Sequence, residues 1–234
     1  MTESSFVKEN LQAVRERMEK ACAAAGRSAD EVELLAVTKT VDPVYINEAI
    51  ACGVTQIGEN RVQEYLGKRD ALHLSGVKTH LIGHLQTNKV KAIVGAVDMI
   101  QSVDSLHLAQ AISNASTARG IKTDVLVEVN IGREPQKSGV LPEELPALLE
   151  NLAPLAGISV RGMMTVPPIL EKEYEKRKIF SEMYQLFIDN STKKIDNIDI
   201  HILSMGMSGD YYEAILEGAT VVRIGTAIFG HRHY

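Results

Sequence analysis

The chain has no tryptophan, only two cysteines and no long hydrophobic run among its 234 residues. Cys22 and Cys52 are too few for a disulfide framework, which favours a reducing, cytoplasmic location. The sequence has no run of about 18 apolar residues, so we expect no membrane-spanning helix. The first residues also lack the basic-then-apolar pattern of a secretory signal. Basic residues are not in excess either, and a net charge of −5 argues against nucleic acid or an anionic membrane as a partner.

The composition that remains, 45% apolar and 24% charged, is ordinary for a soluble globular protein. Residues 5–26 are predicted to open the chain as an amphipathic helix that Gly26 ends, because their apolar positions form one stripe. The stripe repeats at intervals of four, three, four and three residues: Val7, Leu11, Val14, Met18 and Ala21.

From residue 31 onward, short apolar strands alternate with helical segments, a pattern typical of parallel β-α-β units. Eight such units predict a (β/α)8 barrel, an α/β fold, as a single domain over residues 1–234. A doubly wound open sheet is the alternative, although no glycine-rich dinucleotide fingerprint follows the first strand. The predicted strands are 33–38, 55–58, 79–83, 98–101, 124–129, 159–164, 200–205 and 220–225; the predicted helices between them are 43–52, 60–71, 86–95, 105–119, 142–153, 171–190 and 209–217.

The first predicted strand ends in a lysine. Strand alternation places Leu35, Val37 and Lys39 on one face, so the amine lies at the C-terminal end of the strand on the same side as core residues. One interpretation is a lysine that extends to solvent from a strand end. The other is an amine whose pKa is lowered by its surroundings and that forms a Schiff base with a carbonyl group.

Small and hydroxylated residues follow the last two strands, where barrels often bind phosphate. Ser204, Ser208 and Gly209 follow the seventh strand, and Gly225 and Thr226 follow the eighth. Such residues let backbone N–H groups approach an anion, and the hydroxyls add donors. The alternative is that they only form turns.

Arg223 lies within the eighth predicted strand, on the face opposite Val222 and Ile224. It therefore points into the barrel mouth, where a permanent cation needs an acceptor. That acceptor is either a buried carboxylate, Glu128 or Glu59, or the ring nitrogen of a bound heterocycle. An imine-forming lysine, a phosphate site and an arginine for a pyridine nitrogen together describe a site for pyridoxal 5′-phosphate (PLP).

Over nearly its whole length the chain closely resembles the pyridoxal phosphate homeostasis protein family, which is related to the N-terminal domain of alanine racemase. The resemblance includes Ile-Gly-Glu-Asn at 57–60 and Val-Arg-Ile-Gly-Thr at 222–226. Two departures are small: Thr38 stands where serine is common, and Gly209 where an acidic residue is frequent. The matching blocks are 36–40, 57–64, 81–89, 101–104, 129–132, 136–139, 162–165, 203–208 and 222–230.

The resemblance implies a monomeric or weakly associating barrel that holds PLP as an internal aldimine on Lys39. It implies that Ser204 or Ser208, with Gly225 and Thr226, binds the phosphate. It places Arg223 beside the pyridine nitrogen and Asn60 near the ring face. An arginine there leaves the nitrogen unprotonated and the ring a poor electron sink, which disfavours most PLP catalysis.

We therefore expect a protein that carries, buffers or delivers PLP, with apo forms of PLP-dependent enzymes as candidate acceptors. The related racemases take a second base from a further domain, for which this chain leaves no room. The alternative is a small PLP enzyme such as an amino-acid racemase, with Tyr211, His84 or His201 as the second base. A metal site on His80 and His84 is weaker still, because no third ligand has a convincing spacing.

Overall fold

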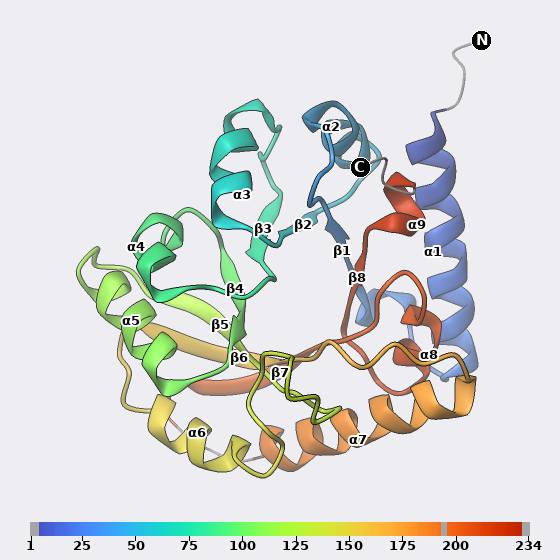
Figure 1. Ribbon diagram of the computed structural model, residues 1–234. Coiled ribbons are helices and arrows are strands. Elements are labelled where there is room, and N and C mark those ends of the chain that lie inside the picture. The colour runs from blue at the N-terminus through green and yellow to red at the C-terminus, as the bar shows by residue number, and fades with distance from the viewer. Residues whose placement is uncertain (1–4, 193–195, 231–234) are drawn as a thin grey trace.

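Eight parallel strands form a closed barrel in a computed structural model that describes residues 5–192 and 196–230 (Figure 1). The strands pair in sequence order, and β8 closes the ring against β1 through pairs such as Leu35 with Arg223. The barrel prediction is therefore confirmed, and the alternative of an open sheet is wrong. The strands are β1 Glu33–Val37, β2 Gln56–Glu59, β3 Lys78–Leu81, β4 Met99–Val103, β5 Thr123–Glu128, β6 Ile158–Met164, β7 Ile198–Ser204 and β8 Val221–Ile224.

Helices follow the strands on the outside of the barrel, close to the predicted positions (Figure 1). Residues 86–95 differ most from prediction: they form a 3₁₀ turn, Thr87–Lys89, and the single-turn helix α4 Val90–Ile93. Their content of β-branched residues disfavours a long helix. A further short helix after β8, α9 Thr226–Phe229, was not predicted. The remaining helices are α1 Phe6–Ala24, α2 Pro43–Ala51, α3 Val62–Lys68, α5 Leu106–Thr117, α6 Leu145–Leu152, α7 Glu173–Ser191 and α8 Tyr211–Leu216.

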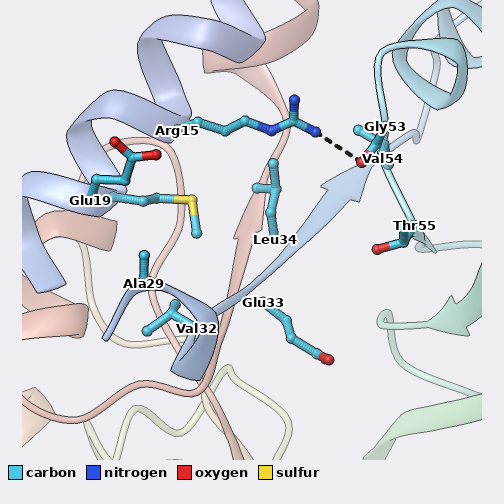
Figure 2. Close-up of a pocket in the computed structure, with 10 residues that line it drawn as sticks. Arg15, Glu19, Ala29, Val32, Glu33, Leu34, Gly53, Val54 and Thr55 are labelled. Atoms are coloured by element: carbon cyan, nitrogen blue, oxygen red, sulfur yellow. Dashed lines mark hydrogen bonds between the residues drawn. The ribbon is translucent and has the colours of Figure 1, made fainter. Parts of the chain in front are cut away.

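The N-terminal helix α1 covers the side of the barrel where its first and last units meet. It lies along α8 and α9, at the right of Figure 1. The Ser5 hydroxyl caps its first turn by accepting from the Val7 backbone N–H at 3.2 Å. Farther along, Arg15 donates to the carbonyls of Cys52 at 2.9 Å and Gly53 at 2.8 Å, which joins α1 to the end of α2 (Figure 2). This contact also closes one side of a pocket of about 260 Å³ between α1 and β1.

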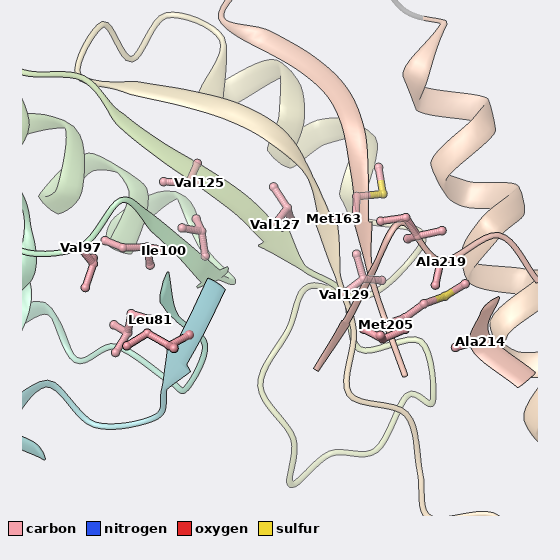
Figure 3. Packing of buried hydrophobic residues seen from close by; sticks show 14 of the residues in the cluster. Leu81, Val97, Ile100, Val125, Val127, Val129, Met163, Met205, Ala214 and Ala219 are labelled. Carbon is pink, nitrogen blue, oxygen red and sulfur yellow. The ribbon is translucent and has the colours of Figure 1, made fainter. Parts of the chain in front are cut away.

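Most of the apolar core lies between the strands and the surrounding helices. Figure 3 shows part of it, where Val125, Val127 and Met163 of neighbouring strands pack together. The barrel interior holds only two small apolar clusters, one around Leu35 and one around Leu126, within the part of the chain that the structure describes. Polar side chains fill much of the remaining interior, which is unusual for a barrel core. Among residues 5–192 and 196–230, no helix is long and apolar enough to cross a membrane.

Candidate functional site

A pocket of about 280 Å³ lies at the C-terminal ends of the strands, where barrels of this kind place their active sites. It contains six of the seven predicted site residues; Ser204 does not contribute to its wall. Apolar side chains from β1, from the segments after β3 and β6 and from the loop after β7 complete it. The full lining is Val37, Lys39, Asn60, Ile82, Val166, Met207, Ser208, Gly209, Arg223, Gly225 and Thr226.

Lys39 is held in place through its two neighbours along the chain. The Thr38 carbonyl accepts from Lys68 Nζ at 2.7 Å, and the Thr38 hydroxyl donates to Glu59 Oε1 at 2.5 Å. On the other side, the backbone N–H of Thr40 donates to Glu64, and Thr40 has the left-handed φ of 61°. The segment carrying the amine is therefore fixed by contacts on both sides of it.

Lys68 is the centre of that arrangement. Its ammonium group lies 2.5 Å from Glu59 Oε1 and 3.1 Å from Glu64 Oε1. Burial raises the pKa of Glu59, while its hydrogen bonds with Lys68 and Thr38 act in the opposite direction. Lys68 is not among the predicted site residues; its only sequence signal is the four-residue spacing from Glu64.

Asn60 lines the pocket, and the chain after β3 passes unusually close to its backbone. A Cβ atom at Gly83 would lie 2.3 Å from the Asn60 carbonyl oxygen, so only glycine allows this approach. The predicted end of β3 at residue 83 is also wrong, because the strand ends at Leu81.

Arg223 is buried at 3% exposure, and its guanidinium group is bound by neutral oxygens. It donates to Ser204 Oγ and to the Thr165 carbonyl, each at 2.8 Å. Burial lowers its pKa to about 10, so the group stays charged at neutral pH. Glu59, a predicted partner, is instead paired with Lys68. Two of the five N–H donors of Arg223 are used in these bonds, and the side chain lines the pocket.

Glu128, the other predicted partner of Arg223, is a buried carboxyl group near the arginine. Burial, with a smaller contribution from the charge of Asp104, raises its pKa to about 7 against the opposing charge of Arg223. Among the described residues, Arg223 and Glu128 form no ion pair. A nearby carboxyl with this pKa is only partly ionised at neutral pH and does not fully neutralise the arginine.

The two candidate phosphate serines have different environments. Ser208 lines the pocket, and its hydroxyl accepts from the backbone N–H groups of Gly225 at 3.3 Å and Ala227 at 3.2 Å. These amides belong to the start of α9, and Gly209, which follows Ser208 in the chain, faces open space. Ser204 is fully buried, and its hydroxyl accepts from Arg223 and donates to Gln101. The geometry therefore favours Ser208 for an anion in the pocket.

The histidines and the tyrosine proposed for other chemistry lie elsewhere. His80 points into the barrel, whereas His84 follows the end of β3 and pairs with Asp104 at 3.5 Å, so the two histidines do not share a strand face. His201 is exposed and pairs with Asp199 at 3.3 Å. Tyr211 is buried at the start of α8, near the guanidinium of Arg17.

Metal binding is not supported either. Among the residues that the structure describes, no group of three or more histidine, cysteine, aspartate or glutamate side chains is arranged to hold a metal ion. The His80 and His84 pair therefore gains no third ligand from the fold.

Comparison with known proteins places this barrel in a class. The family model of the alanine racemase N-terminal domain matches residues 9–233. A solved alanine racemase from Clostridium difficile shares the fold with a TM-score of 0.71 at 17% identity, over 97% of this chain and 57% of that one.

Closer relatives define the family within that class. The pyridoxal phosphate homeostasis protein of Aquifex aeolicus is 45% identical over 226 residues, which are 97% of this chain and 98% of the relative. That of Pseudomonas aeruginosa is 40% identical over 98% of this chain and 97% of the relative. The structure of PipY from Synechococcus elongatus with PLP bound has a TM-score of 0.83 at 31% identity, over 96% of this chain and 100% of PipY. The chain belongs to the pyridoxal phosphate homeostasis protein family.

Proposed function

We propose that this protein binds PLP in the pocket at the C-terminal ends of the strands and serves PLP homeostasis by carrying, buffering or delivering the cofactor. One observation carries the proposal: an amine, a buried arginine that lacks an ion-pair partner among the described residues, and a hydroxyl beside backbone amides line the same pocket of about 280 Å³. The names of the relatives, pyridoxal phosphate homeostasis proteins, support the same role. PipY, with PLP bound, has the same fold at 31% identity.

Each group of the pocket suits a different part of PLP. The Lys39 amine would bond covalently to the aldehyde. Ser208, Gly225 and Thr226 would provide hydroxyl and backbone donors for the phosphate. Arg223 would donate toward the pyridine nitrogen, and Asn60 would lie near the face of the ring. When bound, the cofactor supplies an electrophilic carbonyl and an electron-withdrawing ring, and an arginine at the ring nitrogen weakens that withdrawal.

Borohydride reduction tests the covalent step. Wild-type protein incubated with PLP should absorb visible light, and borohydride should remove the colour and leave one stable adduct on Lys39, measured by peptide mass spectrometry. Lys39→Ala should lose the adduct, whereas Lys8→Ala, which removes an exposed lysine from α1, should keep it. An equal yield of adduct in Lys39→Ala would move the bond to another lysine and contradict the assignment.

We infer a binding role rather than catalysis. The proposed second bases do not line the pocket: His201 is paired with Asp199 on the outside, and Tyr211 is buried under Arg17. The competing function is a small PLP enzyme such as a racemase. Single-enantiomer amino acids in deuterium oxide separate the two, because a carrier should give no sustained α-deuteration. Turnover that depends on Lys39 would overturn the binding role.

Transfer, location and assembly belong to the same proposal. A loaded protein that delivers PLP should restore activity to an apo-enzyme in the presence of a phosphatase that destroys free PLP. If the loaded protein restored apo-enzyme activity no faster than free PLP does, the role would be limited to storage.

We also propose a cytoplasmic monomer; Cys22 and Cys52 are both free thiols, which suits a reducing compartment. The assignment of residues 1–234 to one domain stays a prediction.

A further inference from the structure

A chain of hydrogen bonds crosses the interior of the barrel from Arg223 to His80. Arg223 Nη1 donates to Ser204 Oγ at 2.8 Å, and Ser204 Oγ lies 2.8 Å from Gln101 Oε1. The Gln101 amide nitrogen then lies 2.8 Å from His80 Nδ1. The chain joins β8, β7, β4 and β3, and all four side chains are buried.

The direction of every bond in this chain follows from its arginine end. A guanidinium group can only donate, so the Ser204 oxygen accepts from Arg223 and its hydrogen is free to go to Gln101 Oε1. Gln101 then presents its NH₂ group to His80, which makes Nδ1 an acceptor. His80 is therefore neutral and carries its proton on Nε2. Burial lowers the pKa of His80 to about 4, in agreement with this state.

The chain links two cavities. Arg223 lines the pocket that contains Lys39, while Gln101 and His80 line a second cavity of about 210 Å³ at the N-terminal end of the barrel. His80 Nε2 is buried without a hydrogen-bond partner among the described residues, so the chain ends there. Gln56 lines the same second cavity, but its side chain contacts Glu33 and is not part of the hydrogen-bond chain.

We propose that Gln101 and His80 are positioning residues for Arg223: they fix the Ser204 hydroxyl so that the guanidinium group is held between Ser204 and the Thr165 carbonyl, with its remaining donors toward the pyridine nitrogen of PLP. The inference rests on the proposed function. Without an acceptor at position 101, the Ser204 hydrogen loses its partner and the arginine is held by one fixed oxygen instead of two.

Two glutamine-to-methionine substitutions in the second cavity test the proposal. Gln101→Met removes both links of the chain, and Gln56→Met makes the same change to a buried glutamine outside it. We expect Gln101→Met to shift the absorption maximum of the PLP-loaded protein and to raise the Kd for PLP about tenfold. Gln56→Met should match the wild type, and both variants should still form the borohydride adduct on Lys39.

A conservative variant and an NMR measurement complete the test. Gln101→Glu keeps an oxygen acceptor for Ser204 and should retain the Kd within about threefold. It also serves if Gln101→Met does not fold. Nitrogen-15 NMR of wild-type protein without added PLP should show His80 neutral at pH 7, with its proton on Nε2. In Gln101→Glu, His80 should carry a proton on Nδ1, because the carboxylate can only accept.

The outcomes separate the inference from the proposed function. A wild type that does not bind PLP would overturn both. Normal wild-type binding with an unchanged spectrum and Kd in Gln101→Met would overturn the inference alone. Equal changes in Gln101→Met and Gln56→Met would also overturn it, because they would indicate a general effect on the barrel interior. A His80 proton on Nδ1 in the wild type would contradict the direction of the chain.

Discussion

Two cations that are largely shielded from solvent lie near Lys39, one beside its chain segment and one in its pocket, and they are satisfied in opposite ways. Lys68, 10% exposed, is paired with two carboxylates, and Glu59 beside it is 1% exposed. Arg223, 3% exposed, is bound by a hydroxyl and a backbone carbonyl, and its chain of partners ends at a neutral histidine. The charge of Lys68 is compensated by carboxylates of the protein itself, whereas Arg223 keeps charge and hydrogen-bond donors available for a ligand. Lys68 is therefore structural, and Arg223 is the cation that suits a ligand.

The largest effect is expected at the neutralised cation. Lys68→Met leaves Glu59 buried without its partner and releases the Thr38 carbonyl, so at pH 8 the free energy of unfolding should fall by about 3–5 kcal/mol. Urea denaturation measures this change. Arg69→Met is the matched control, because the Arg69 pair with Asp70 is exposed and should contribute less than about 1 kcal/mol.

The double variant tests the cause. If the loss comes from the uncompensated carboxylate, Glu59→Gln combined with Lys68→Met should be more stable than the sum of the single effects predicts, by about 1–3 kcal/mol. Strict additivity would show that Lys68 does not act through Glu59, and the contrast with Arg223 would then lose its electrostatic basis.

The second prediction concerns protonation of His80, which adds a positive charge at the far end of the hydrogen-bond chain from Arg223. Since burial lowers the pKa of His80 from 6.5 to about 4, the unfolded chain binds more protons than the native state between these values. The contribution of His80 to the free energy of unfolding is therefore fully present above pH 6.5. As the pH falls to 4, about 3 kcal/mol of it is lost.

His80→Asn isolates that contribution, because asparagine offers an oxygen where Nδ1 accepts but does not titrate. Between pH 7 and pH 4, the wild type should lose about 3 kcal/mol more stability than the variant, measured by urea denaturation at each pH. The raised pKa of Glu128 acts in the opposite direction but is common to both proteins. Parallel pH profiles would mean that His80 is as easily protonated in the folded protein as in the unfolded chain.

How far the sequence predicts this contrast depends on the range of the interactions. Alternation within β8 places Arg223 correctly on the inward face, because that signal is local. Lys39 lines the pocket as predicted, but β1 ends at Val37 and Lys39 lies in the turn that follows. The partners of both cations depend on the closed barrel. Ser204 and Gln101 are separated by 103 positions, and no local pattern brings them together. Lys68 resembles an ordinary last-turn lysine of a surface helix until the fold places it against the Thr38 carbonyl.

The third prediction removes the positive charge of Arg223, which the carboxyl groups of Glu128 and Asp210 compensate only in part. Arg223→Met should raise the Kd for PLP about 30-fold, since a hydrogen bond from a charged group is lost. Its free energy of unfolding should stay within about 1 kcal/mol of the wild type, because replacing a buried charge by an apolar side chain is often neutral. A stability loss as large as that of Lys68→Met would remove the distinction between the two cations.

The smallest effect is expected at the phosphate side, and it separates the roles of the two serines. Ser208→Ala removes a hydroxyl that lies beside the amides of Gly225 and Ala227, which should raise the Kd for PLP about threefold. Pyridoxal, which lacks the phosphate, should bind Ser208→Ala and wild type equally. Ser204→Ala disturbs Arg223 instead, so it should weaken both ligands by the same factor. If Ser204→Ala affected PLP alone, Ser204 would be the phosphate ligand, and Arg223 would not depend on its hydroxyl.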